Sequence, residues 1–205
     1  MIPDLSRYDR IVDWPAAKAG GVDIAILCAG YGLLGDPYFA RNIVLAKKAG
    51  VRRVMAYWAT YPSIDRLAQE ERLLANFEAF EGELADGYSP LSDDPIAQLP
   101  PLWNDAEKNG GKPPVTVRVF ERAFTESIQQ TAGVECGIYT APYWWDANVG
   151  NQLWAAQHAL WLAHYLVAAP RVPRPWARYD LWQYTDHGTC PGVTGTCDMN
   201  RLWTS

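Results

Sequence analysis

Apolar residues fall along the chain in short continuous runs that alternate with longer stretches of helical periodicity. Residues 22–29 are almost entirely apolar, which is typical of a strand that is covered on both faces. Residues 37–49 predict the helix that follows, with Asp36 as the expected N-cap and Gly50 as the stop. Pro37 would then take the first helical position, where its missing N–H costs nothing. This part of the chain therefore predicts a strand followed by a helix.

The same alternation continues through the rest of the sequence. Further helices are predicted at 64–84 and 115–131, and the Gly, Pro, Ser and Asp of residues 86–98 predict a loop. The expected apolar stripe of the 64–84 helix consists of Leu67, Leu74, Phe77 and Leu84. Short apolar runs predict the remaining strands at 2–5, 52–58, 99–104, 135–140, 160–164, 180–184 and 196–199.

Eight predicted strands limit the possible architecture. Repeated strand and helix units predict a parallel sheet, and eight such strands favour a closed α/β barrel of the TIM type. A chain of 205 residues is short for that fold, so helices are expected to be missing from the later units. No internal repeat or linker divides the sequence, and residues 1–205 are therefore expected to form a single domain.

Charge and composition narrow the possible partners. The net charge is −5 and no Lys/Arg cluster offsets it, which argues against nucleic-acid binding. No apolar run approaches the roughly 18 residues that a membrane-spanning helix needs. Residues 1–7 lack the basic and then apolar pattern of a secretory signal, so no signal peptide is expected. We expect a monomer that binds neither membrane nor nucleic acid.

The aromatic content points to a different kind of ligand. The chain contains 10 Trp and 11 Tyr but only 5 Phe, although Phe serves equally well in a core. Trp and Tyr combine a flat apolar face with a polar edge, a combination that suits the stacking of sugar rings. Any single Trp is more often a large core residue than a ligand contact. The excess over Phe nevertheless favours a carbohydrate-binding surface.

Asp105 and Glu107 follow a short apolar run and lie two residues apart. Side chains at that spacing in a strand point to the same side, so both carboxyl groups would face one pocket. Two carboxyl groups that close repel each other when both are ionised, and one of them is expected to keep a proton near neutral pH. Cleavage of a glycosidic bond uses such a pair, in which an acid protonates the leaving oxygen and a carboxylate stabilises the positively charged transition state. Alone, the pair is a weak signal, because Asp-x-Glu usually lies on a solvated face.

Several separate segments match one family in the family's own order. The ordered set resembles glycoside hydrolase family 25, the Chalaropsis-type lysozymes or N-acetylmuramidases, from Asp4 to about Trp203. No single segment is specific for the family, but the complete set in this order is. The matching segments are Asp4 with its neighbours at 3–6, the Asp-Pro-x-Phe-like start at 35–42, the Asp-x-Glu segment at 101–107, and the later strands at 138–145, 160–165, 181–185 and 195–201.

The resemblance implies a (β/α)5(β)3 barrel that hydrolyses peptidoglycan at the β-1,4 bond between N-acetylmuramic acid and N-acetylglucosamine. Glu107 matches the general acid and Asp105 its partner, while Asp4 and Asp198 match two further acids of the same pocket. Asp105 would orient the 2-acetamido group of the substrate, and this group would itself attack the sugar. Neither a cofactor nor a metal is implied.

Six aromatic residues in or beside these segments are the candidate sugar-binding side chains. Peptidoglycan is the expected partner, and the absence of a signal fits a bacteriophage endolysin that reaches the wall from the host cytoplasm or on the virion. A non-catalytic module that holds cell-wall glycan on the same fold is the alternative function. The candidates are Tyr57, Trp58, Tyr139, Trp144, Trp161 and Trp182.

Three departures from the family pattern affect substrate details but leave the four acids in place. Residues 28–32 read Cys-Ala-Gly-Tyr-Gly where many relatives have Lys-Ala-Thr-Glu-Gly, which removes a charge pair near the barrel rim. Trp58 and Ala59 stand where many relatives have His and Phe, and Asn104 replaces an aliphatic residue before Asp105. A variant glycan or altered pKa values of the acids would fit these changes.

The four cysteines leave several possibilities open. Cys190 and Cys197 bracket a turn and are expected to form a small loop disulfide. Free thiols are the alternative, and a zinc site with His187 is a third, although the spacing matches no standard zinc pattern. Cys28 and Cys136 lie in predicted strands and would act there as small apolar residues.

Overall fold

The N-terminal strand closes a barrel by pairing with strands from both halves of the chain. In the computed structural model, which describes residues 1–11 and 13–203, β1 (Ile2–Leu5) is parallel to β3 (Ile24–Tyr31) and antiparallel to β11 (Cys197–Leu202). From β3 the barrel continues through parallel strands to β9, which pairs with β11. The intervening strands are β5 (Arg53–Ala59), β6 (Leu102–Asp105), β7 (Cys136–Thr140), β8 (Leu160–Ala163) and β9 (Leu181–Gly188).

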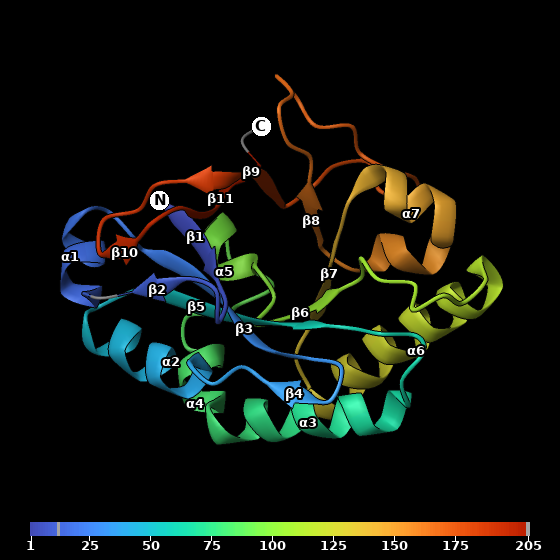
Figure 1. The fold of residues 1–205 in the computed structure, drawn as a ribbon, viewed down its shortest axis with the longest axis horizontal. Helices are drawn as coiled ribbons and strands as arrows, with labels where there is room; N and C mark the ends of the chain where they lie inside the picture. The colour runs from blue at the N-terminus through green and yellow to red at the C-terminus, as the bar shows by residue number, and fades with distance from the viewer. Residues whose placement is uncertain (12, 204–205) are drawn as a thin grey trace.

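Within the part of the chain that the structure describes, helices follow only the first five barrel strands. The last three strands, β8, β9 and β11, follow one another without an α-helix and leave one side of the barrel uncovered (Figure 1). The (β/α)5(β)3 expectation is therefore confirmed. The helices are α1 (Trp14–Ala19), α2 (Phe39–Lys48), α3 (Arg66–Ala79), α4 (Glu81–Ala85), α5 (Pro95–Gln98), α6 (Pro114–Ala132), α7 (Pro142–Asn148) and the 3-10 turn η1 (Leu153–Gln157). Short strands add β4 (Leu34–Gly35) beside β3 and a separate pair, β2 (Arg10–Ile11) and β10 (Val193–Thr194).

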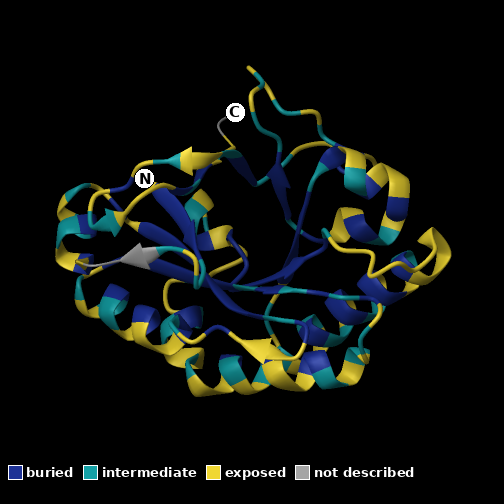
Figure 2. Cartoon of the chain, viewed as in Figure 1, coloured by how far each residue is buried: buried dark blue, intermediate teal, exposed yellow. Residues whose placement is uncertain are grey.

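Alternation along the strands divides the core into an inner and an outer part. One set of side chains fills the barrel, and its larger members include Met55, Trp103 and Trp161. The other set packs under the helices, for example Leu27 and Phe124. Figure 2 shows most of the barrel strands as buried and the outward helix faces as exposed. Among the described residues, no helix is long and apolar enough to cross a membrane.

The structure corrects the expected start of the first long helix. Helix α2 begins at Phe39, and Asp36 is not its N-cap. Asp36 instead accepts hydrogen bonds from the backbone N–H groups of Tyr38 and Arg7, at 2.9 and 2.7 Å. Its carboxylate thus ties the loop after β1 to the loop before α2, which is a use of Asp that local capping rules do not capture.

The predicted 64–84 helix is also wrong as a single element. It consists of α3 and α4, which meet at Phe80, a residue with non-helical backbone angles (φ −132°, ψ 24°). Leu67 is 62% exposed because α3 turns Gln69 and Leu73 toward the barrel instead. Gln69 donates to the carbonyl of Tyr61 and accepts from its N–H, so a polar side chain takes an inner position.

Two smaller boundaries differ as well. The predicted 86–98 loop contains the short helix α5, which Asp94 caps through the N–H of Ile96. The strand expected at 99–104 begins only at Leu102, since Pro100 and Pro101 have no N–H to give to a ladder.

Gly137 on β7 yields a test of the inner packing. A Cβ at this position would overlap the ring of Trp103, which is fully buried on the neighbouring strand. Gly137→Ala should therefore lower the free energy of unfolding by about 1–3 kcal/mol in urea titrations. Gly82→Ala is the matched control, because its Cβ would meet no atom within 4 Å. An equal stability of the two variants would contradict the described packing.

Candidate active site

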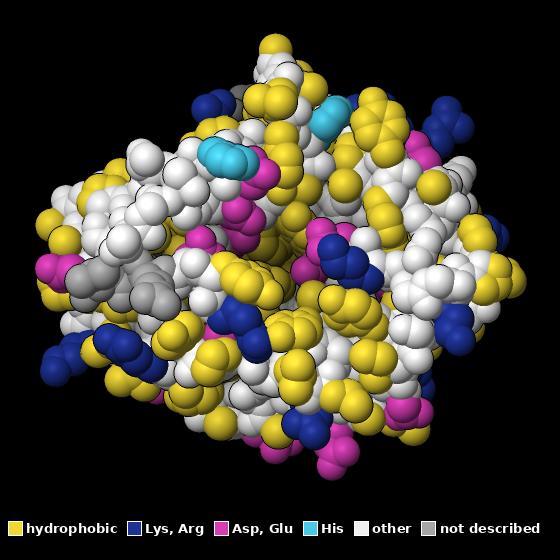
Figure 3. Space-filling model, in the orientation of Figure 1, with side chains coloured by type: hydrophobic (Ala, Val, Ile, Leu, Met, Phe, Trp, Pro, Cys, Tyr) yellow, Lys and Arg dark blue, Asp and Glu magenta, His cyan; other side chains and the backbone are white. Residues whose placement is uncertain are grey.

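A cavity of about 190 Å³ opens at the ends of the parallel strands, where barrel proteins place their functional groups. Figure 3 shows a hollow with hydrophobic walls, Asp and Glu side chains at its rim and Lys or Arg side chains beside it. We call this space the acidic cavity. Its lining residues are Asp4, Tyr57, Asp105, Glu107, Tyr139, Trp161, Tyr165, Gln183 and Asp198. All four predicted acids are therefore brought together.

Asp4 and Asp198 face each other because β1 and β11 pair antiparallel in that register. Gln183 on β9 links them, since its Nε2 donates to both oxygens of Asp4, at 3.1 and 3.0 Å, and to Asp198 Oδ2 at 3.2 Å. Asn200 adds a fourth contact, a 2.7 Å hydrogen bond to Asp4 Oδ2. Two amide side chains thus fix the position of the most deeply buried acid of the cavity.

The same two amides also hold aromatic side chains. Gln183 Oε1 accepts from the hydroxyl of Tyr139 at 2.8 Å and from the hydroxyl of Tyr165. Asn200 Oδ1 accepts from Trp161 Nε1 at 2.6 Å. The ring centroids of Tyr139 and Trp161 are 4.5 Å apart, so the aromatic wall and the acids form one connected network.

Burial controls the charge of this pair of acids. Burial, followed by the charge of Asp198, raises the pKa of Asp4 well above its ordinary range. Burial, followed by the charges of Asp9 and Asp186, raises the pKa of Asp198 to about 6. At neutral pH the inner end of the cavity therefore carries less negative charge than its composition suggests.

Asp105 ends β6 and Glu107 follows it by two residues, as the sequence predicts. Asp105 is only 6% exposed, and its Oδ1 has no hydrogen-bond partner among the described residues. Burial, followed by the charge of Glu107, raises the pKa of Asp105 well above its ordinary range. Glu107 is more accessible, with 35% of its side chain exposed, and its Oε1 lies 2.8 Å from Lys108 Nζ. The buried member of the pair is therefore the one whose pKa is raised.

A second cavity of about 320 Å³ adjoins the first and shares Tyr57, Asp105 and Glu107 with it. We call it the tyrosine cavity. It extends from the shared residues toward the loop after β1 and the end of β3. Its remaining lining residues are Ser6, Arg7, Tyr8, Cys28, Tyr31, Asp36, Ala59, Tyr61 and Lys108.

Three of the six predicted sugar-binding residues, Tyr57, Tyr139 and Trp161, line the acidic cavity. Trp58 is fully buried under the outer layer, so its prediction as a sugar contact is wrong. The reason is strand alternation, because Trp58 directly follows Tyr57 and points to the opposite side of β5.

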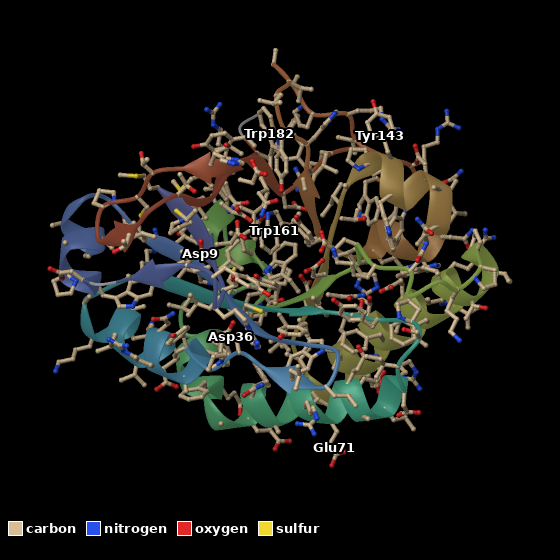
Figure 4. All side chains as sticks on the ribbon, viewed as in Figure 1. Asp9, Asp36, Glu71, Tyr143, Trp161 and Trp182 are labelled. Carbon is tan, nitrogen blue, oxygen red and sulfur yellow. The ribbon has the colours of Figure 1, made fainter. Side chains whose placement is uncertain are left out.

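Trp182 and Trp144 line neither of the two cavities described above. Trp182 is next to the inward Gln183 on β9, and its Nε1 donates to the His164 carbonyl. Trp144 lies on α7 and packs against the core outside the barrel. Figure 4 shows Trp161 near the middle of the molecule and Trp182 toward its edge.

Tyr165, Gln183 and Asn200 complete the network but were not among the predicted site residues. In the structure, Gln183 and Asn200 are buried polar residues at inward positions of β9 and β11, which the sequence alone does not show. Tyr165 follows the end of β8, where periodicity gives no direction to a side chain. Uncharged polar residues of this kind are seen as site residues only after their partners are known.

Asn104, one of the departures from the family pattern, belongs to a buried polar cluster behind Asp105. Its Nδ2 donates to Glu121 Oε2 at 2.9 Å and to Thr125 Oγ1 at 3.0 Å. Thr60 Oγ1 lies 3.1 Å from the same Glu121 oxygen and 3.2 Å from the carbonyl of Asp105. The cluster connects α6 to the strand end that carries the acid pair.

The cysteines are all free thiols, so the expected Cys190–Cys197 disulfide is not present. Cys190 Sγ lies 3.6 Å from the carbonyl oxygen of Pro191, and Cys197 Sγ lies 3.8 Å from Met199 Sδ. The neighbouring Cys197 thiol lowers the pKa of Cys190. The zinc alternative also fails, since the described residues contain no group of three His, Cys, Asp or Glu placed to hold a metal ion. His187 pairs with its neighbour Asp186.

A closed barrel with a cluster of carboxyl groups at its strand ends is an arrangement typical of glycosidases. The family model for glycosyl hydrolases family 25 matches residues 3–193. The chain therefore belongs to glycosyl hydrolases family 25, and by family it is a glycoside hydrolase.

Individual relatives agree with this membership. Lysozyme M1 of Streptomyces globisporus is 24% identical over 97% of the chain, which spans 66% of that protein's length. A bacterial lysozyme from Streptomyces coelicolor has a similar structure, with a TM-score of 0.82 and 26% identity over 99% of this chain and 91% of the other. A muramidase from Acremonium alcalophilum shares the fold, with a TM-score of 0.78 and 24% identity over 99% of this chain and 93% of the other.

Glu121 leads to a prediction about stability and pH. Burial raises the pKa of Glu121 to about 8, against 4.5 for an exposed glutamate. The folded protein thus keeps this proton over a range in which the unfolded chain has lost it. The contribution of Glu121 to the free energy of unfolding is therefore fully present below about pH 4.5. It is lost, and the free energy of unfolding falls, as the pH rises to about 8. Glu121→Gln cannot titrate, so urea titrations at about pH 5 and pH 8 should show a smaller fall than in the wild type.

The exposed Glu126 on the same helix supplies the control. Glu126→Gln should keep the full wild-type fall in stability between the two pH values. If Glu121→Gln behaves in the same way, the buried carboxyl is not the source of the pH dependence.

Proposed function

We propose that this protein is a peptidoglycan hydrolase that cleaves the β-1,4 bond between N-acetylmuramic acid and N-acetylglucosamine. The observation that carries the proposal is the pair formed by Asp105 and Glu107 at the end of β6, one buried and one accessible, in a cavity walled by aromatic rings. Family membership supports the same activity.

Glu107 is assigned as the general acid. Its side chain is partly exposed at the cavity, so it can reach the oxygen of a glycosidic bond and exchange protons with solvent. Lys108 holds the Glu107 carboxylate in an ion pair, and this ion pair must separate before Glu107 can give a proton to a sugar. Displacement of Lys108 by the bound glycan therefore prepares the acid.

Asp105 is assigned to orient the 2-acetamido group of the sugar. It is buried, and one of its oxygens has no partner, so a carboxylate here has spare capacity to accept the N–H of an amide. The pair shares one proton. With Lys108 on Glu107 the proton stays on Asp105, and a substrate that displaces Lys108 and supplies an N–H favours the proton on Glu107.

The reaction then proceeds in two displacements. The acetamido oxygen attacks the anomeric carbon while Glu107 protonates the leaving oxygen, which breaks the glycosidic bond. Water attacks the same carbon from the opposite side, opens the ring formed by the acetamido group and gives its proton to the Glu107 carboxylate. Two inversions leave the β-configuration of the sugar unchanged.

Asp4 and Asp198 support this chemistry without reacting. Their carboxyl groups lie in the same cavity, where negative charge stabilises the positive charge that develops on the sugar. Trp161 and the tyrosines beside it provide flat surfaces for the sugar rings.

Glu107→Gln tests the assignment of the acid. Gln has nearly the same shape but cannot donate the proton in the transition state, so release of reducing ends from purified peptidoglycan should fall by about 10²–10⁴-fold. Glu126→Gln, which changes an exposed glutamate on α6, is the control and should keep wild-type activity.

Two results would count against the proposal. Activity of Glu107→Gln above about a tenth of the wild-type rate would exclude Glu107 as the acid. A wild-type protein that binds peptidoglycan without releasing any reducing ends would instead be the glycan-binding module considered as the alternative.

A further inference from the structure

Arg7 is one of two cations among the described residues in the wall of the tyrosine cavity, the other being Lys108, and its contacts hold it in place. Its guanidinium carbon lies 4.4 Å from the ring centroid of Tyr31, and its Nη2 donates to the carbonyl of Gly35 at 3.0 Å. These contacts fix the plane of the guanidinium before any ligand arrives. Tyr31 belongs to residues 28–32, one of the segments in which the sequence departs from the family pattern.

Arg7 also has unused hydrogen-bonding capacity. Its Nε is buried and has no hydrogen-bond partner among the described residues. The nearest carboxylate, Asp36, lies 3.8 Å from that atom and is occupied by two backbone N–H groups. Because Nε itself is shielded, a bound anion would meet the accessible part of the Arg7 side chain, of which 24% is exposed.

The acids of the tyrosine cavity leave the guanidinium accessible to a ligand. Glu107 is paired with Lys108, and Asp36, which forms an ion pair with Arg7 at 3.8 Å, has a side chain that is only 2% exposed. Burial raises the pKa of Asp105, which reduces the negative charge that this group contributes. The end of the cavity at Arg7 therefore presents a positive charge to a ligand.

Substrate chemistry connects this cation to the acid pair. In N-acetylmuramic acid the 2-acetamido group and the 3-O-lactyl group are on neighbouring ring carbons. If the acetamido group is held by Asp105, the lactyl arm leaves the ring beside it. The tyrosine cavity begins at that point, since it shares Asp105 and Tyr57 with the acidic cavity.

We propose that Arg7, held by Tyr31, forms a subsite for a carboxylate on the 3-O side arm of the muramic acid residue. The carboxylate is either the lactyl group itself, on strands without stem peptides, or an acidic group of an attached peptide. The subsite rests on the proposed function and deepens it, because it selects muramic acid over N-acetylglucosamine at the position beside Glu107.

Titration calorimetry of the wild type with uncleaved sugars tests the subsite. The probes are the methyl β-glycosides of N-acetylmuramic acid, of its lactyl methylamide, of N-acetylglucosamine and of N-acetylmuramyl-L-alanyl-D-isoglutamine. A charge-assisted hydrogen bond predicts that at least one carboxylate-bearing sugar binds about tenfold more tightly than the two neutral sugars. Tighter binding of the N-acetylmuramic acid glycoside identifies the lactyl carboxylate as the ligand of the subsite. Tighter binding of the dipeptide glycoside alone identifies a carboxylate of the stem peptide.

Arg7→Gln should abolish this preference and leave the binding of N-acetylglucosamine unchanged. Arg122→Gln, which alters an exposed arginine on α6, is the matched control and should keep the preference. If Arg7→Gln does not fold, Tyr31→Leu tests the same point by removing the surface that holds the guanidinium, and the preference should be reduced.

Equal binding of charged and neutral sugars by the wild type would overturn the subsite, as would a preference that survives in Arg7→Gln. The probes contain no bond between two sugars, so these results do not depend on catalysis by Glu107. A protein that cleaves peptidoglycan but shows no preference dependent on Arg7 would contradict the subsite alone. A protein with the preference but without hydrolysis would contradict only the proposed function.

Discussion

Closure of the barrel by β11 is the constraint on which the site depends. This strand runs antiparallel between β9 and β1, and its register sets Asp198 opposite Asp4, at the other end of the chain. On its other side β11 approaches β9 closely, and Gly188 of β9 allows this because a side chain there would overlap Met199. The two amides on these last strands, Gln183 and Asn200, then hold the acids and the aromatic wall in one network. Without closure of the barrel, the four acids of the acidic cavity would lie on an open sheet, and no cavity would bring them together.

A second consequence of the architecture is the unequal environment of the two acids on β6. Asp105 is the last residue of the strand and is held inside the barrel, whereas Glu107 has left the strand and meets solvent and Lys108. The polar cluster of Asn104, Thr60 and Glu121 fixes the strand end from behind. A spacing of two residues therefore yields two carboxyl groups in different surroundings, which is the condition for dividing the roles of acid and orienting group between them.

Strand order could be predicted from the sequence because it depends on local patterns, whereas the four acids were predicted through the resemblance of the ordered segments to one family. Apolar runs such as 22–29 mark the strands, and Asp105 and Glu107 follow one of them. The direction of individual aromatic side chains could not be predicted as well, since one step along a strand reverses it, as Trp58 shows after Tyr57. The prediction that Leu67 lies on the buried stripe of its helix was wrong for a related reason. Tertiary hydrogen bonds place Gln69 on the inner face of α3, and Leu67 is exposed. Gln183 and Asn200 act through partners distant in sequence, and no local pattern encodes those contacts.

The configuration of the first product tests the central claim most directly, namely that a substrate amide oriented by Asp105 reacts with the sugar while Glu107 handles the protons. Proton NMR of a defined peptidoglycan fragment, recorded before mutarotation, reports the anomer formed at the new reducing end. The account predicts that the β-anomer appears first, because two inversions retain the configuration. Initial formation of the α-anomer would mean that water attacks directly, and would contradict the mechanism.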